Sequence, residues 1–79
     1  MKAKIFVRLK SGVLDPQGLA VSKSLQSLGY DGIESVRQGK MFEVEVNTTD
    51  KAKAEQMLKE AAAKLLANTV IEDFEISLS

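Results

Sequence analysis

The stretch "KSGVLDPQG", residues 10–18, holds the residues whose types and spacing come closest to a binding motif. It combines Lys10, two glycines and Asp15 at the point where a strand-like run gives way to a helix-like one. A phosphate-binding loop needs successive backbone amides, supported by the positive end of a helix dipole, turned toward the anion. Here Asp15 occupies that end of the helix, and neither the Walker-type nor the dinucleotide-binding glycine spacing is present. We interpret the stretch as a turn followed by a helix cap.

Other reactive side chains are scarce, because the chain contains no His and no Cys. This removes the commonest general base and metal ligand, as well as thiolate and disulfide chemistry. Carboxylates are plentiful, but neighbouring strand residues such as Glu72 and Asp73 point to opposite sides and cannot readily act on one substrate atom. We therefore predict no catalytic, cofactor-binding or metal-binding residue.

The length and net charge of the chain further limit the classes of function it can have. Residues 1–79 are expected to form one domain, of a size at which oligomerisation commonly supplements a small core. Eleven basic residues balance eleven acidic ones, so the chain lacks the field that binders of nucleic acids or anionic membranes use. No apolar run is long enough for a membrane span or signal peptide, and we expect a cytoplasmic protein.

Periodicity predicts the secondary structure. Alternation of apolar and polar residues indicates strands, and three-to-four spacing indicates helices. In the first helix, Val21, Leu25 and Leu28 follow one another at helical spacing. The first predicted elements are a strand over 3–9 and a helix that Asp15-Pro16 opens and Gly29 ends. A weaker strand over 33–38 follows, and Gly39-Lys40 turn it into a strand over 41–46. The last two elements are a helix that Thr49 or Asp50 caps and Asn68 stops, and a strand over 70–78.

This βαββαβ order predicts an α+β fold, the ferredoxin-like two-layer sandwich. One antiparallel sheet would carry both helices on one face, with the first and third strands central. On the open face, the basic residues of the first strand would lie between acidic residues of its two neighbours and be neutralised by them.

Apolar side chains would interrupt this charged face. Phe6, Met41 and Ile71 form a patch of the composition expected where a surface meets another protein chain. With Arg8, they are our candidates for an oligomer interface. The simpler interpretation, a few scattered exposed apolar residues, stays open.

Two binding functions use the same topology. RNA-recognition domains stack bases on exposed aromatic residues, but here the third strand turns Met41, Glu43 and Glu45 outward, and carboxylates there would repel RNA. Regulatory domains that sense small molecules bind amino acids between protomers, and no feature of the sequence excludes that alternative.

Three stretches, "GVLDPQGLAV", "VRQGKMFE" and "KLLANTVIEDF", occur in this order along the chain. Together they resemble the PurS family, the small subunit of bacterial and archaeal phosphoribosylformylglycinamidine synthase. The likeness runs from the first strand almost to the last residue. One departure is Thr69, where many relatives carry Pro after the Asn.

The resemblance implies a bridging role in de novo purine biosynthesis, without an active site in this chain. The enzyme converts formylglycinamide ribonucleotide (FGAR), ATP and glutamine to formylglycinamidine ribonucleotide (FGAM). A glutaminase subunit (PurQ) releases ammonia, and a synthetase subunit (PurL) uses it together with ATP and Mg. The small subunit, a homodimer or dimer of dimers that binds no cofactor, would hold the two together. Our candidates for contact with these subunits are Asp15, Arg37, Lys40, Asn68, Glu72 and Asp73.

Overall fold

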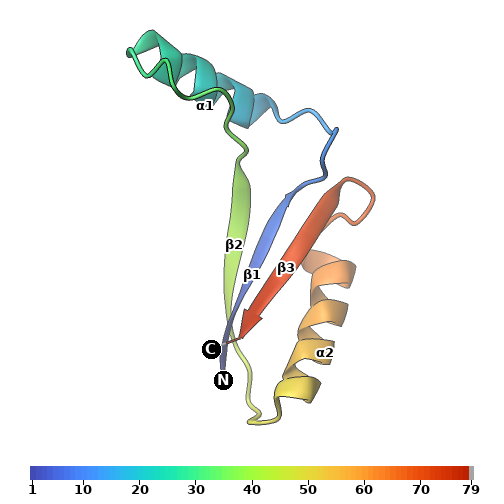
Figure 1. Cartoon of the computed structure of the whole chain (residues 1–79). Coiled ribbons are helices and arrows are strands. Elements are labelled where there is room, and N and C mark those ends of the chain that lie inside the picture. Colours follow the sequence, from blue (N-terminus) through green and yellow to red (C-terminus); the bar gives the residue numbers. More distant parts are fainter. Residues whose placement is uncertain (79) are drawn as a thin grey trace.

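A three-stranded antiparallel sheet organises the chain, as the computed structural model, which describes residues 1–78, shows (Figure 1). The strands are β1 (Lys2–Leu9), β2 (Gly39–Glu45) and β3 (Glu72–Leu78), in the order β2-β1-β3. Ile5 of the central strand lies opposite Phe42 on one side and Ile76 on the other. All three belong to the apolar half of an alternating strand, so this register brings apolar side chains to one face of the sheet.

Two helices connect the strands. Helix α1 (Pro16–Ser27) follows β1, and α2 (Lys51–Ala61) precedes β3. Each begins at an aspartate, Asp15 or Asp50, whose carboxylate accepts hydrogen bonds from amides of the first turn. Helix α1 ends before Gly29, which adopts a φ of 98° that favours glycine.

The second helix continues into a π-helical turn, η1 (Ala62–Leu66). The amide of Ala67 donates to the carbonyl of Ala62, five residues earlier, at 2.8 Å. Both alanines are buried. The wider turn therefore returns Ala67 to the face that the rest of the helix buries.

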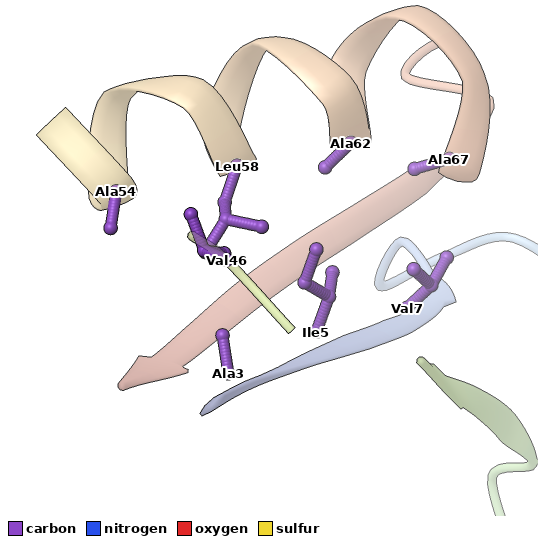
Figure 2. Packing of buried hydrophobic residues seen from close by; sticks show 8 residues of the cluster. All are labelled: Ala3, Ile5, Val7, Val46, Ala54, Leu58, Ala62 and Ala67. Atoms are coloured by element: carbon purple, nitrogen blue, oxygen red, sulfur yellow. The ribbon is translucent and has the colours of Figure 1, made fainter. Parts of the chain in front are cut away.

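The core lies between α2 and one face of the sheet (Figure 2). Small residues on the helix let it approach the sheet closely, and Ile5 and Val7 are the largest side chains that are fully buried. The buried cluster consists of Ala3, Ile5, Val7, Val46, Ala54, Leu58, Ala62 and Ala67.

Helix α1 stands away from this core (Figure 1). We call residues 10–38, which contain α1 and the run that returns from it to β2, the arm. Because the arm projects beyond the sheet, the chain measures 48 × 25 × 14 Å and its Cα radius of gyration is 15.8 Å. A compact chain of this length would have a radius of gyration of about 12 Å. The arm therefore makes the molecule elongated.

The structure confirms the α+β class, the antiparallel sheet and the central place of the first strand. The prediction of a strand over 33–38, turned into the next strand by a hairpin, is wrong for this chain. Gly39 and Lys40 do not turn but pair with Arg8 and Val7 as the first residues of β2. The preceding run consequently leads away from the sheet, and α1 does not share a face of the sheet with α2.

Candidate protein-interaction site

The six residues predicted to contact partner subunits gather at one end of the sheet. This is the end where β1 finishes and where β2 and β3 begin, so the antiparallel order brings distant parts of the sequence together. We call it the polar end, and it consists of Asp15, Arg37, Lys40, Asn68, Glu72 and Asp73.

Asp15 joins the two segments that connect the arm to the sheet. One carboxylate oxygen accepts from the amide of Gly18 at 2.9 Å, and the other accepts from the amide of Gln38 at 2.8 Å. The hydrogen bond from Gly18, followed by that from Gln38, holds the pKa of Asp15 below its ordinary value, although burial opposes the shift. The charge of Arg37 lowers the pKa further. The residue predicted as a helix cap is therefore also a link between the two connections.

Acid is expected to weaken this link. A carboxylate whose pKa is lower in the folded state stabilises that state above its unfolded pKa, near 3.8, and loses this contribution as the pH falls through the folded value. The difference in unfolding free energy between the unmodified chain and Asp15→Asn should thus be constant at neutral pH and shrink below about pH 4. Urea unfolding at fixed protein concentration measures it, and Asp31→Asn, in the exposed loop after α1, is the control. A difference as large at pH 3 as at pH 7 would contradict this role of the charge.

Arg37, on the run that returns to β2, binds the segment that leads from β1 to α1. Its guanidinium donates to the carbonyl oxygens of Val13 at 3.0 Å, Lys10 at 3.1 Å and Leu9 at 3.3 Å. These three carbonyls line the path from β1 toward α1. A planar guanidinium can donate hydrogen bonds in several fixed directions at once. A lysine ammonium, on a flexible stem, would orient its hydrogen bonds less precisely. Arg37 and Asp15 together fix the base of the arm.

The remaining members of the polar end belong to β2, β3 and the segment before β3. Glu72 accepts from the amide of Asn68 at 2.7 Å and lies 4.0 Å from the ammonium of Lys40. Asp73 pairs with Lys10 at 3.1 Å. A hollow of about 260 Å³ opens beside them, lined by Val7, Arg8, Leu9, Asp15, Gln17, Gln38, Gly39, Lys40 and Glu72. The polar end thus presents charged groups of both signs around a shallow depression.

The predicted oligomer-interface residues lie on the sheet face opposite α2. Phe6 and Met41 are cross-strand neighbours and stay 40% and 46% exposed. Arg8 pairs with Glu75 at 3.6 Å, so the predicted neutralisation by an acidic residue of a neighbouring strand holds for Arg8. Ile71, also 40% exposed, accepts from the amide of Lys10 and lies one row beyond Arg8. The structure gathers these residues on one surface, and their contact with another chain stays a prediction.

The sequence did not predict that the apolar stripe of α1, formed by Val21, Leu25 and Leu28, would be exposed. Val21 is 39% exposed, Leu28 is 74% exposed and Leu25 between them is only half-buried. Their helical spacing was visible, but it is the usual pattern of a helix packed on its own sheet. Because the chain extends through Gly39 instead of forming the predicted hairpin, α1 does not pack on its own sheet and this stripe stays uncovered.

Residues 1–78 contain no group of three or more His, Cys, Asp or Glu side chains that could hold a metal ion. Within the same residues, no helix is long and apolar enough to cross a membrane. A second hollow, of about 390 Å³, lies against Lys2, Ala3, Lys4, Glu43, Val44, Glu45 and Ser77. Its lysines and glutamates face one another across strands, and nothing there favours the small-molecule-sensing alternative.

Comparisons with known proteins identify the family of this chain. Residues 2–79 match the family model described as PurS, phosphoribosylformylglycinamidine (FGAM) synthase. The PurS subunit of phosphoribosylformylglycinamidine synthase from Synechocystis is 49% identical over 71 residues, which cover 90% of this chain and 71% of that protein.

Solved structures resemble the chain over nearly its whole length. Bacillus subtilis PurS superposes with a TM-score of 0.85 and 45% identity, covering 96% of this chain and 94% of that one. A chain of the Thermotoga maritima PurLQS structure superposes with a TM-score of 0.88 and 33% identity, covering 96% and 93%. The fold, the length and the sequence therefore agree, and this chain belongs to the PurS family.

Proposed function

We propose that this chain is the non-catalytic bridging subunit of a phosphoribosylformylglycinamidine synthase. It docks the glutaminase subunit onto the synthetase subunit, so that ammonia released from glutamine reaches FGAR. The observation that carries the proposal is the likeness to a chain of the PurLQS structure over almost the full length of both chains. The chain binds no cofactor itself, and ATP and Mg act in the synthetase. The assembly works in the cytoplasm.

A bridge needs surfaces rather than reactive groups, and the described residues provide them. The polar end offers charged groups from three segments, and the outer face offers Phe6 and Met41. Docking two enzymes side by side raises the effective concentration of the transferred molecule. Ammonia that escapes into neutral water is protonated and stops being a nucleophile, so close and oriented docking preserves it.

The chain acts as a homodimer or a dimer of dimers. Its small core and the exposed apolar surfaces of arm and sheet favour association. Sedimentation or light scattering of the purified chain tests this directly, and a monomer at micromolar concentration would contradict it.

Reconstitution tests the bridging function. The synthetase and glutaminase are assayed with and without this chain, using either glutamine or ammonium as the nitrogen source. Glutamine-dependent FGAM synthesis should require the chain, whereas ammonia-dependent synthesis should need it little. Equal glutamine-dependent rates with and without the chain would overturn the proposal.

Lys40 provides a test of the polar end. Its ammonium is exposed and paired only loosely, at 4.0 Å, with Glu72. For Lys40→Ala we expect the concentration of chain that gives half the maximal glutamine-dependent rate to rise about threefold, since truncating a charge at an interface weakens association. Lys53→Ala, at the start of α2 and the far end of the sheet, is the matched control. Equal effects of the two variants would place the docking surface elsewhere.

A further inference from the structure

A hollow of about 280 Å³ opens beside Gly39 on the outer face of the sheet, the face that α2 does not cover. Gly39 lies opposite Arg8 and brings no side chain to this face. A Cβ on Gly39 would lie 2.5 Å from the carbonyl oxygen of Val7 and 3.3 Å from the Cβ of Arg8, so the approach of the two strands requires glycine here. We call this space the cationic hollow, and its lining includes Phe6, Arg8, Arg37, Lys40 and Met41.

The charges that line the cationic hollow have one sign. Arg8, Arg37 and Lys40 contribute to it, and none of its lining residues within 1–78 is acidic. The hollow at the polar end and the larger one of about 390 Å³ each include two acidic residues. The three positive charges therefore favour an anionic group in the cationic hollow.

Arg37 places a fixed positive charge at the hollow. Its guanidinium donates to the carbonyl oxygens of residues 9, 10 and 13, which carry no net charge to cancel it. The carboxylate oxygens of Asp15 accept instead from the amides of Gly18 and Gln38. Within residues 1–78, the charge of Arg37 is thus held in place by neutral acceptors.

Arg8 is the cation that a ligand can recruit at least cost. Its guanidinium lies 3.6 Å from a carboxylate oxygen of Glu75, and the two side chains are 66% and 70% exposed. An ion pair this exposed contributes little to stability, because water screens it and both side chains must be held still. Arg8 can therefore exchange Glu75 for a carboxylate that excludes water and accepts two parallel hydrogen bonds.

Phe6 and Met41 give the cationic hollow an apolar wall, because they are cross-strand neighbours and both stay partly exposed. Acidic residues border this wall, since Glu75 lies opposite Phe6 and Glu43 follows Met41 on the same face of β2. A nucleic acid or an anionic membrane would meet these carboxylates as well as the cations. The hollow therefore fits a single carboxylate that stands beside an apolar side chain.

We propose that the cationic hollow binds a segment of a partner subunit in which a carboxylate stands beside an apolar side chain. The carboxylate accepts hydrogen bonds from Arg8, in place of Glu75, and the two other cations add to the attraction. The apolar side chain packs on Phe6 and Met41. The inference rests on the proposed function and names the chemistry of the docked segment.

A second copy of this chain fits the cationic hollow less well than a different protein does. A two-fold interface centred on the hollow would bring the same three cations of both copies together. In a dimer, insertion of a different surface would fill one hollow and leave the other empty. We therefore assign Phe6, Arg8 and Met41, predicted from the sequence as part of an oligomer interface, to contact with a partner subunit.

Removing the charge of Arg8 tests the inference in the reconstituted enzyme. For Arg8→Gln, we expect the concentration of chain that gives half the maximal glutamine-dependent rate to rise about tenfold, because the docked carboxylate loses its partner. The maximal rate should stay the same, since excess chain restores docking. Lys4→Gln, on the same face of β1 but outside the lining of this hollow, is the matched control and should change that concentration by less than about twofold. Equal effects of the two variants would overturn the inference.

Met41→Ala tests the apolar wall in the same assay. We expect the half-maximal concentration to rise about fivefold, because the docked side chain loses apolar contact. Leu65→Ala is the control, since Leu65 is also an exposed apolar residue but lies in η1. If both variants behaved alike, the docked segment would have no apolar contact here and the inference would fail.

A zero-length cross-link identifies the occupant. A carbodiimide joins an amine to a carboxylate in contact with it, and it is applied to the complex of both partner subunits with the Arg8→Lys chain. Mass spectrometry should find position 8 joined to an acidic residue in an acidic and apolar segment of a partner subunit. Lys4 is the internal control and should join no partner peptide. Cross-links from position 8 only to this chain or to another copy of it, or none at all, would overturn the inference.

Failure of the inference can be told apart from failure of the proposed function. If the unmodified chain supports glutamine-dependent synthesis but Arg8→Gln acts like Lys4→Gln, the inference alone fails. If the unmodified chain supports no such synthesis, the proposed function fails and the inference fails with it.

Discussion

Replacing Gly18 by valine is expected to separate α1 from the run that follows it. A Cβ at this position would lie 2.2 Å from the carbonyl oxygen of Val36 and 2.8 Å from a carboxylate oxygen of Asp15. The first neighbour is backbone, so the clash cannot be relieved by a side-chain rotation. We expect the free energy of opening of the α1 amides to fall by about 3 kcal/mol, at the upper end of the usual cost of overpacking.

Hydrogen exchange followed by mass spectrometry measures this change segment by segment. Protection of α1 should fall, while β1, α2 and β3 keep theirs, because Gly18 lies far from the core. Gly32→Val is the matched control, since a Cβ on Gly32 meets nothing within 4 Å. If both valine variants exchanged at the same rate, the close approach of α1 and its returning run would not exist in solution.

Truncating Ile5 to alanine is expected to remove most of the stability of the core. Ile5 lies on the central strand, is 0% exposed, and contacts a cluster made largely of alanines that cannot expand to fill a void. Such truncations cost about 2–5 kcal/mol. A single core of this size supplies a net stability of roughly 3–5 kcal/mol, so the variant should be mostly unfolded unless association rescues it.

Urea unfolding of a graded series tests the core. Ile5→Val should lose about 0.5–1.5 kcal/mol and Ile5→Ala the larger amount. Leu65 is 84% exposed, so Leu65→Ala should change the free energy of unfolding by no more than about 0.5 kcal/mol. All variants are compared at one protein concentration, because association shifts apparent stability. A similar loss for Leu65→Ala and Ile5→Ala would show that α2 does not pack on β1 as described.

The parts of the fold that local patterns determine could be predicted from the sequence. Asp15 and Asp50 cap their helices as expected, because a carboxylate before a helical run satisfies amides that have no other acceptor. Alternation fixed which side of each strand faces α2, and with it the pairing of Arg8 and Lys10 with acidic residues of β3. The gathering of the polar end followed from the antiparallel order.

The parts that depend on competition between distant contacts could not be predicted. Whether Gly39 and Lys40 turn or extend depends on how the rest of the arm is held, and the pattern around them permits either. The hydrogen bonds of Arg37 to three carbonyls between residues 9 and 13 have no local sequence pattern. The sequence also does not predict whether the helix continues after Ala62 with π-helical or α-helical hydrogen bonds. The alanine-rich run from 61 to 67 has no hydrophobic period that favours either kind of turn.

The π-helical turn bears on how this sequence can change in length. Ala62 and Ala67 are both directed at the core although five residues separate them, because their hydrogen bond spans one residue more than in an α-helix. Deleting one exposed position between them, such as Lys64, would let the turn close with ordinary α-helical bonding. Both alanines would keep their orientation and β3 would keep its alignment with β1. This turn is therefore a site where descendants of the gene can lose a codon without disturbing the packed interior.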